Sequence, residues 1–327
     1  FGTDQNWSAE PLVAAKDILD DLLLKIRFIG YGNKRDPFYL SVGNLNSITL
    51  GHGLIMNEYT NNSDFPVVRR IGVDIGFNTE YFGMEAIAND LIVPEIFGGR
   101  IHITPFGSRF PLSLGVSGIA DINPRAIAED DSQPNPIIIN GGIDLDYPIL
   151  SADALSLLLY ADAAAMVPYF AETTVIGTAP NTTTIEQGFQ TDIVLTPENE
   201  LKNFGAAAGV MGNLATFQWK LEARFFNGTF RPGYFDRTYD RMRYAYVDDL
   251  LTYLQNPSAE EYSGFTLGVF GYGGFDIADI FTLDSGYMWP WDIRDDQVIV
   301  SEEDTFFIRA LLDRSVIPYA DMELSFE

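Results

Sequence analysis

The sequence predicts an all-β protein, folded as a transmembrane antiparallel β-barrel of about 14 strands (roughly 12–16). Three observations predict it. Apolar and polar residues alternate along many short segments, connections between segments are either very short or long, and aromatic residues gather at segment ends. We expect one domain over residues 1–327, with an N-terminal helical segment at 1–21 and one long, partly helical loop at 227–261.

The alternation has the two-residue period of a β-strand. In residues 137–147, apolar odd positions oppose polar residues such as Asp144 and Asp146, and residues 217–225 repeat the pattern around Lys220 and Glu222. Such a strand has one apolar and one polar face. The apolar face meets either lipid, with the polar face lining a wet lumen, or the core of a soluble sandwich or barrel. Strong segments are 71–78, 97–104, 112–123, 137–147, 217–225 and 321–327; weaker ones are 22–30, 37–45, 46–52, 81–89, 155–166, 188–195, 203–213, 262–272, 274–285 and 305–313.

Small residues on the polar face favour the membrane alternative. Glycine weakens a strand, so a solvent-facing sheet surface rarely carries many of them, whereas a crowded barrel interior can use them. The small residues concerned are Gly72, Gly76, Ser113, Gly115 and Ser117.

The connections favour the same alternative. Residues 78–80 and 272–274 are predicted to be tight turns, whereas 54–68, 123–135, 167–187 and 227–261 are long and polar. Short turns on one side and long loops on the other are typical of outer-membrane barrels. Aromatic residues at strand ends suit interfacial girdles, although aromatic residues also favour strands in general. They include Tyr81, Phe82, Tyr169, Phe170, Phe225, Phe226, Tyr287, Trp289 and Trp291.

Two segments are predicted to be helical. Residues 8–21 begin with Ser8 as a candidate N-cap and carry apolar residues on one face. This helix could lie on a membrane surface, but we favour a plug inside the barrel or a packed N-terminal helix. The second helix, 238–255, lies within the longest loop.

Composition excludes several classes of function. The formal charge of −26 argues against nucleic-acid binding, which needs a basic surface. The chain has no cysteine and two histidines, so we expect no metal site and no cofactor. No apolar run is long enough for a membrane-spanning helix, and no signal peptide is recognised. We expect no enzyme activity either, because neither His52 nor His102 has a matching serine and no Gly-x-Ser-x-Gly motif occurs.

The long loop carries the clearest candidate site. Residues 231–244 contain four arginines interleaved with aromatic residues. If this loop folds inward, its arginines could oppose acidic residues of the wall and create a transverse field that selects solutes. The alternatives are a loop pinned by Arg–Asp and Arg–Tyr pairs, or a platform that binds sugar or peptide. The expected constriction sets Arg231, Arg237, Arg241 and Arg243 against Asp144, Asp146 and Asp162, with Arg100, Lys220, Glu222 and Arg224 also facing the lumen.

Acidic runs offer a second kind of site. They could bind divalent cations that bridge to lipid head groups or to a surface layer, although acidic runs are usually solvated loops. The runs are 129–131, 248–249, 295–296 and 302–304.

The alternation, the turn asymmetry and the terminal Met322–Phe326 resemble bacterial outer-membrane β-barrel proteins, in which a last strand ending in Phe guides assembly. Here Phe326 is followed by Glu327. Residues 46–53 and 230–235 look like stretches of uncharacterised bacterial envelope proteins. The resemblance implies a bacterial outer-membrane location, contact with outer-membrane lipid, and either a homo-oligomer or an envelope or surface-layer partner.

The sequence thus favours a porin-like channel for small solutes, constricted by the Arg/Tyr-rich loop. One alternative is a non-conducting structural or adhesive barrel whose acidic loops bind a partner or divalent cations. A soluble, secreted all-β protein is a third possibility.

Overall fold

The computed structural model describes residues 28–34, 36–61, 70–127, 133–152, 154–178, 180–197, 199–277, 281–294, 297–301, 304–312 and 322–326. Most of these residues lie in β-strands, which confirms the all-β prediction. The strands are β1 (Phe28–Tyr31), β2 (Phe38–Gly43), β3 (Gly72–Asn78), β4 (Phe82–Ala88), β5 (Ile96–Ile103), β6 (Ser113–Asp121), β7 (Ile137–Ala152), β8 (Leu155–Phe170), β9 (Thr174–Thr178), β10 (Asn181–Ile185), β11 (Gly188–Phe189), β12 (Phe204–Leu214), β13 (Phe217–Phe226), β14 (Phe265–Ile277), β15 (Phe281–Arg294), β16 (Gln297–Val300), β17 (Thr305–Leu312) and β18 (Met322–Phe326). The helices are η1 (Gly107–Arg109), η2 (Thr191–Ile193), α2 (Tyr239–Gln255) and η3 (Glu260–Tyr262).

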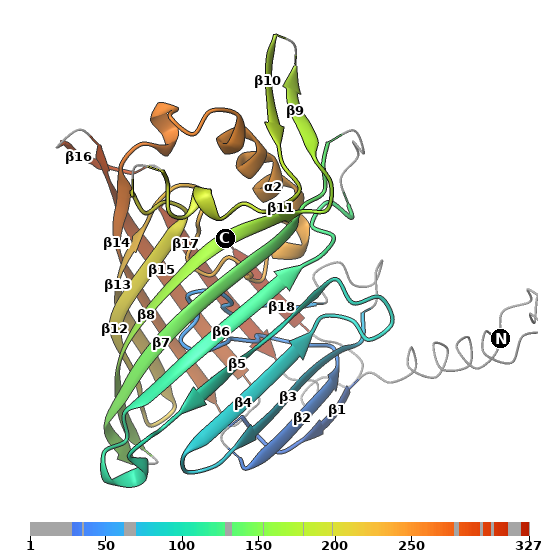
Figure 1. Cartoon of the computed structure of the whole chain (residues 1–327). Coiled ribbons are helices and arrows are strands. Elements are labelled where there is room, and N and C mark those ends of the chain that lie inside the picture. The colour runs from blue at the N-terminus through green and yellow to red at the C-terminus, as the bar shows by residue number, and fades with distance from the viewer. Residues whose placement is uncertain are drawn as a thin grey trace, which may run out of the picture.

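One antiparallel sheet contains all of these strands except β9 and β10, which pair as a separate hairpin. Neighbours in the sheet are mostly consecutive in the chain, in the order β1 to β8, then β12 to β15, β17 and β18. The sheet curls, so that the late strands pass behind the early ones (Figure 1). Long connections, α2 and the β9–β10 hairpin lie at one end, which we call the α2 end; short connections such as 79–81 and 215–216 lie at the opposite end.

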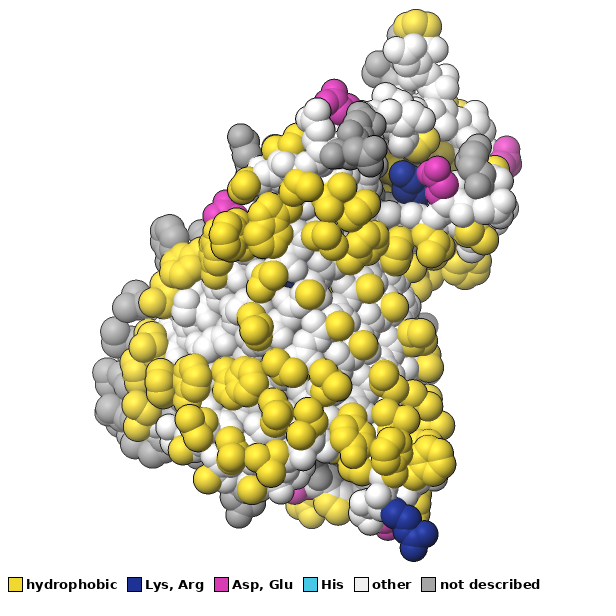
Figure 2. Space-filling model, turned by 90° about the vertical axis from the view of Figure 1, so that its left-hand side faces the viewer, with side chains coloured by type: hydrophobic (Ala, Val, Ile, Leu, Met, Phe, Trp, Pro, Cys, Tyr) yellow, Lys and Arg dark blue, Asp and Glu magenta, His cyan; other side chains and the backbone are white. Residues whose placement is uncertain are grey.

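The two faces of the sheet have opposite chemistry. Ile75, Phe77, Val116 and Ile143 are all exposed on the convex outer face, and Ile143 retains 63% of its surface. No residue at the outward positions of β3–β8 and β12–β15, among those described, is Asp, Glu, Lys or Arg. Figure 2 shows hydrophobic side chains over this surface and charged side chains at its ends. The predicted alternation is therefore confirmed for the strong segments 71–78, 97–104, 112–123, 137–147 and 217–225, except that Ile71 precedes β3 and is buried. The side chains of 321–327 lie outside the described residues.

Aromatic side chains form rows near both ends of the outer face. Near the α2 end, the ring of Phe225 lies 5.3 Å from Phe204 and 4.9 Å from Phe265. Near the opposite end, Phe217 and Phe275 lie 4.7 Å apart. Of the aromatic residues predicted at strand ends, Phe225 lies in such a row, whereas Phe170 is buried in the interior core and Phe226 packs against that core.

The interior of the curled sheet is filled. Residues 44–61, which connect β2 towards β3, form an inner segment without regular strands, and its Met56 and Tyr59 are completely buried. They pack in one hydrophobic cluster with inward residues of the sheet, such as Ile119, and with α2. Backbone hydrogen bonds join this inner segment to residues 229–235, for example from Phe235 N to Ile55 O at 3.0 Å. The inner segment and the long loop thus form a single packed body.

Several boundaries differ from the prediction. The helix predicted at 238–255 is confirmed as α2, and the predicted 8–21 helix lies outside the described residues. The turn predicted at 272–274 is wrong: these residues lie inside β14, where Gly273 leaves room for the ring of Phe217. The strand predicted at 46–52 is also wrong, because Ile48 and Leu50 point into the interior core rather than pairing in the sheet.

The predicted strand at 188–195 is reduced to β11 and a short helical turn. Among the described residues, no helix combines the length and the apolar character needed to cross a bilayer.

Candidate functional site

A polar wall lines the inner face of the sheet from β5 to β13. Strand register places these residues inward, because each occupies the parity opposite to the exposed apolar residues. Arg100 Nε donates to Asp144 Oδ2 at 3.0 Å, and Lys220 Nζ lies 2.8 Å from Glu222 Oε2. Seven of the expected lumen residues are thus brought to this wall: Arg100, Asp144, Asp146, Asp162, Lys220, Glu222 and Arg224.

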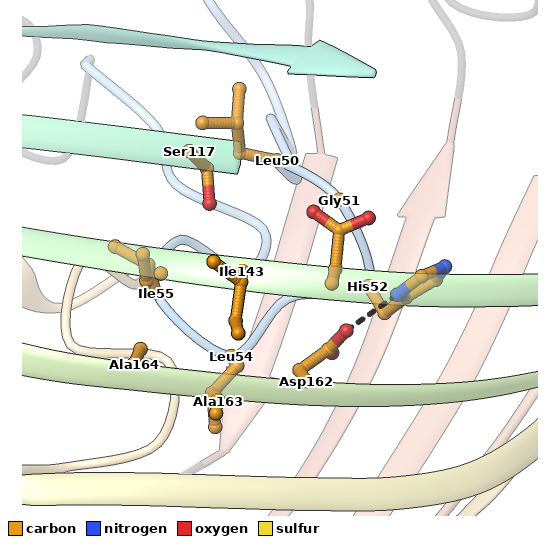
Figure 3. Close-up of a pocket in the computed structure, with 12 residues that line it drawn as sticks. Leu50, Gly51, His52, Leu54, Ile55, Ser117, Ile143, Asp162, Ala163 and Ala164 are labelled. Carbon is orange, nitrogen blue, oxygen red and sulfur yellow. Dashed lines mark hydrogen bonds and ion pairs between the residues drawn. The ribbon is translucent and has the colours of Figure 1, made fainter. Parts of the chain in front are cut away.

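His52 of the inner segment is inserted into this wall. Its Nδ1 lies 2.7 Å from Asp162 Oδ1 and its Nε2 lies 3.6 Å from Asp146 Oδ2. The ring stacks on Tyr160 with centroids 4.5 Å apart, and Lys220 Nζ donates to the backbone oxygen of His52 at 2.7 Å. Figure 3 shows the His52 ring reaching Asp162 from the loop that crosses the interior.

The charge of His52 follows from these neighbours. Burial lowers the pKa of His52, but its contacts with Asp146 and Asp162 outweigh burial and raise this pKa to about 9. The imidazolium is therefore the form present at neutral pH, and it is held between two carboxylates. Because a buried charge is costly unless it is paired, this contact fastens the inner segment to β7 and β8.

Gly51 and Gly53 allow His52 to reach the wall. Both glycines have positive φ angles, +59° and +94° respectively, a conformation that other residues adopt only with strain. A Cβ on Gly53 would lie 2.7 Å from Asn57 Oδ1. The Gly-His-Gly sequence is therefore a tight turn that presents the imidazole.

A second contact joins the inner segment to the far side of the curled sheet. Glu58 accepts a hydrogen bond from Arg309 Nη2 of β17 at 3.1 Å, and Arg237 Nη2 of the long loop lies 3.8 Å from its other oxygen. Arg309 is also paired with Asp284 of β15. Residues 52 and 58 thus bridge strands from opposite parts of the sheet.

A third group of contacts fixes α2 over the interior. Arg70 Nη1 lies 2.6 Å from Asp240 Oδ2, and Tyr59 donates to the other oxygen of Asp240 at 3.1 Å. On the next turn, Arg243 pairs with Glu95 at 2.7 Å and with Asp121 at 3.4 Å. Since Asp240 and Arg243 are almost fully buried, removal of either partner would leave an uncompensated charge.

The four loop arginines do not meet the acidic residues expected to face them. Arg231 pairs with Asp249, Arg237 with Glu58, and Arg243 with Asp121 and Glu95, whereas Arg241 is exposed on α2. Asp144, Asp146 and Asp162 contact Arg100 and His52 instead. The prediction that the loop arginines face Asp144, Asp146 and Asp162 is therefore wrong. The inner segment, rather than the loop, occupies the space beside these carboxylates.

Sequence reasoning missed the inner segment as the central element. The signal was the Gly51-His52-Gly53 turn within an apolar stretch, which we interpreted as part of a strand. It also missed Glu58, Asp240 and Arg309, which pair with residues far away in the chain, and Asp284, which pairs with Arg309 on the neighbouring strand. Within the described part of the chain, no group of three or more His, Asp or Glu side chains could hold a metal ion.

The acidic runs are described only in part. Asp248 pairs with Arg125 and Asp249 with Arg231, so this run is tied to neighbouring arginines. Residues 129–131, 295–296 and 302–303 lie outside the described residues. The chain matches no family model and no curated protein.

Proposed function

We propose that this chain is a closed, 14-stranded β-barrel of a bacterial outer membrane, with an interior that its own inner segment blocks. It would serve as a structural or binding barrel rather than as an open diffusion pore. The observation that carries the proposal is the completely buried apolar centre, with Met56, Tyr59 and Phe235 at 0% exposure inside a sheet whose outer face is apolar.

The apolar outer face supports the membrane location. Contiguous exposed apolar surface of this extent is unfavourable in water but not against acyl chains. Aromatic rows at both ends of the outer face are the arrangement typical of the two membrane interfaces of a barrel. By the usual arrangement of outer-membrane barrels, the α2 end with its long connections faces the outside of the cell.

Closure is supported by the two ends of the strand path. The path from β1 to β18 runs through 14 described strands, so an antiparallel order leaves the first and last strands running in opposite directions, as pairing requires. Lys34, next to β1, donates to Thr49 O at 2.8 Å, and Arg309 of β17 contacts Glu58. Residues near the beginning and near the end of the path therefore contact one short stretch of the inner segment.

Cysteine cross-linking tests closure, since the natural chain has no cysteine. Ile29→Cys is combined in turn with Glu323→Cys, Leu324→Cys and Ser325→Cys of β18, and oxidation is followed on gels. We expect at least one pair to cross-link. Ile29→Cys with Leu283→Cys of β15 is the control and should not. Absence of any β1–β18 cross-link would contradict closure.

Planar-bilayer recording tests the blocked interior. We expect no steady conductance from the wild type, and steady channels when residues 47–59 are replaced by a Gly-Ser linker. A matched control replaces residues 181–184 of β10, which precede the buried Ile185 and are mostly exposed, and should stay silent. Heat-modifiable gel mobility verifies that each variant folds. Steady wild-type currents would contradict the proposal.

The porin-like channel remains a second candidate, because charged residues line the wall beneath the inner segment. Such a channel would conduct only after that segment moves. The double variant His52→Gln/Glu58→Gln releases two of its attachments while the apolar centre stays intact. Solute-dependent currents from this variant, absent from Arg109→Ala, would favour a gated channel; silence from both would favour the blocked barrel.

A further inference from the structure

An open pocket lies at the α2 end, outside the blocked interior. It is formed by the turn after β13, the loop before β14, one residue of α2 and the end of β15, and its cavity of about 160 Å³ opens to solvent at its mouth. The pocket includes Phe265, which belongs to the aromatic row of the outer face.

Two glycines hold the backbone of this pocket in place. Gly264 has a φ of +77°, and a Cβ there would lie 2.1 Å from the backbone oxygen of Ile293. Gly228 has a φ of +64°, and its Cβ would lie 2.4 Å from Asn203 Oδ1. Both loops therefore approach their neighbours more closely than any other residue would allow.

Hydrogen bonds orient the carboxylates of the pocket. Tyr262 donates to Asp249 Oδ1 at 2.9 Å, and Thr266 donates to Asp292 Oδ1 at 2.8 Å. Arg231 Nη2 lies 3.5 Å from Asp249, and Arg294 Nη2 lies 3.4 Å from Asp292. Each ion pair uses one nitrogen of a guanidinium that carries five N–H donors, so donors remain for a ligand.

The charges select the class of ligand. Two arginines and three acidic residues, Asp249, Glu261 and Asp292, give the lining a formal charge of 2 − 3 = −1. An anion would meet the carboxylates, and a divalent cation would meet the guanidinium groups. A neutral ligand with adjacent hydroxyl groups can use both, donating to the carboxylates and accepting from the arginines.

An aromatic ring completes this chemistry. Phe265 lines the pocket and is half-buried, so its exposed part offers apolar surface against which the C–H face of a sugar ring can pack; Phe230 and Tyr262 lie behind it, buried in the core at 1% and 7% exposure. We propose that this pocket binds a neutral saccharide. The site goes beyond the blocked barrel proposed above and does not depend on whether the barrel conducts.

The test is saturation-transfer NMR on the full chain in phosphatidylcholine nanodiscs, with maltose and lactose as probes. We expect saturation transfer to at least one disaccharide. Asp292→Asn and Arg294→Ala should each weaken its binding at least tenfold. Arg109→Ala, an exposed arginine at the opposite end of the sheet, is the matched control and should bind as the wild type does. Heat-modifiable mobility verifies folding.

Competition distinguishes the source of the sugar. Displacement of the disaccharide by nanodiscs that contain a galactolipid would support a membrane glycolipid as the natural ligand, and lack of displacement would support a soluble saccharide. The proposal is overturned if neither probe receives saturation, if Asp292→Asn and Arg294→Ala bind as tightly as the wild type, or if inorganic phosphate binds more tightly than the sugars.

Discussion

The outer and inner faces of the sheet invert the arrangement of a water-soluble protein. The outer face exposes Ile143 and Leu159 at 63% and 49%, whereas the inner face buries Asp162, Glu222 and Arg224 at 8% exposure or less. The inner charges are tolerable because each has a partner of opposite sign on the wall or on the inner segment. The same alternating strand pattern therefore places apolar side chains towards one environment, which we propose is lipid, and charged side chains towards another, the packed interior.

The largest expected effect comes from the interior. Tyr59→Ala should lower the free energy of unfolding by about 3–5 kcal/mol, because it opens a cavity at a fully buried position and removes a hydrogen bond to buried Asp240. Tyr59→Phe keeps the ring and should cost about 1–2 kcal/mol. Urea unfolding followed by tryptophan fluorescence measures both. A loss below about 1 kcal/mol for Tyr59→Ala would mean that the interior is not a packed core.

The cost of a charged substitution on the outer face should depend on whether lipid or water covers that face. Ile143→Arg, near the middle of β7, should destabilise the protein in lipid vesicles by about 2–4 kcal/mol, as charges do at the bilayer midplane. In water, the same change at so exposed a position would cost about 0.5 kcal/mol or less. Val298→Arg, 67% exposed on β16 at the α2 end, is the matched control and should have little effect. Equal, small effects at both positions would contradict the membrane assignment.

The smallest expected effect is pH-dependent and concerns His52. Its pKa is raised from 6.5 to about 9, so the stabilisation is fully present below pH 6.5 and is lost as the pH rises through 9. At most about 3 kcal/mol is involved. His52→Gln should be less stable than the wild type at pH 6, and the gap should close by pH 10. A gap that does not change with pH would show that the imidazolium is not the stabilising form.

Local pattern was sufficient to predict much of the fold. The period-two alternation in residues 112–123, 137–147 and 217–225 gave the correct facing of β6, β7 and β13, because strand geometry alone sets that periodicity. The α2 helix was predicted nearly to its ends. The prediction of a turn at 272–274 was wrong because a glycine pair is typical of a turn, whereas here Gly273 makes room for the ring of Phe217 on the neighbouring strand.

The candidate site was predictable only in part. Register places Lys220, Glu222 and Arg224 on the inner wall, so alternation could assign them. Their partners depend on the long-range arrangement of the chain: Arg309 and Glu58 are 251 residues apart. The inner segment was missed because its apolar residues resemble those of a strand, and nothing local reveals that they pack inside a curled sheet.

The inner segment, residues 44–61, belongs to the connection between two hydrogen-bonded neighbours, β2 and β3, so the chain continues into the sheet at both ends of that connection. A terminal tail could be drawn out of the interior by its free end, one residue after another. A doubly tethered loop has no such end and can only swing outward as a unit about its two hinges, on the side where β2 stops and β3 starts. Any opening of this protein through that loop is therefore a one-sided event, and its reversal needs no rethreading.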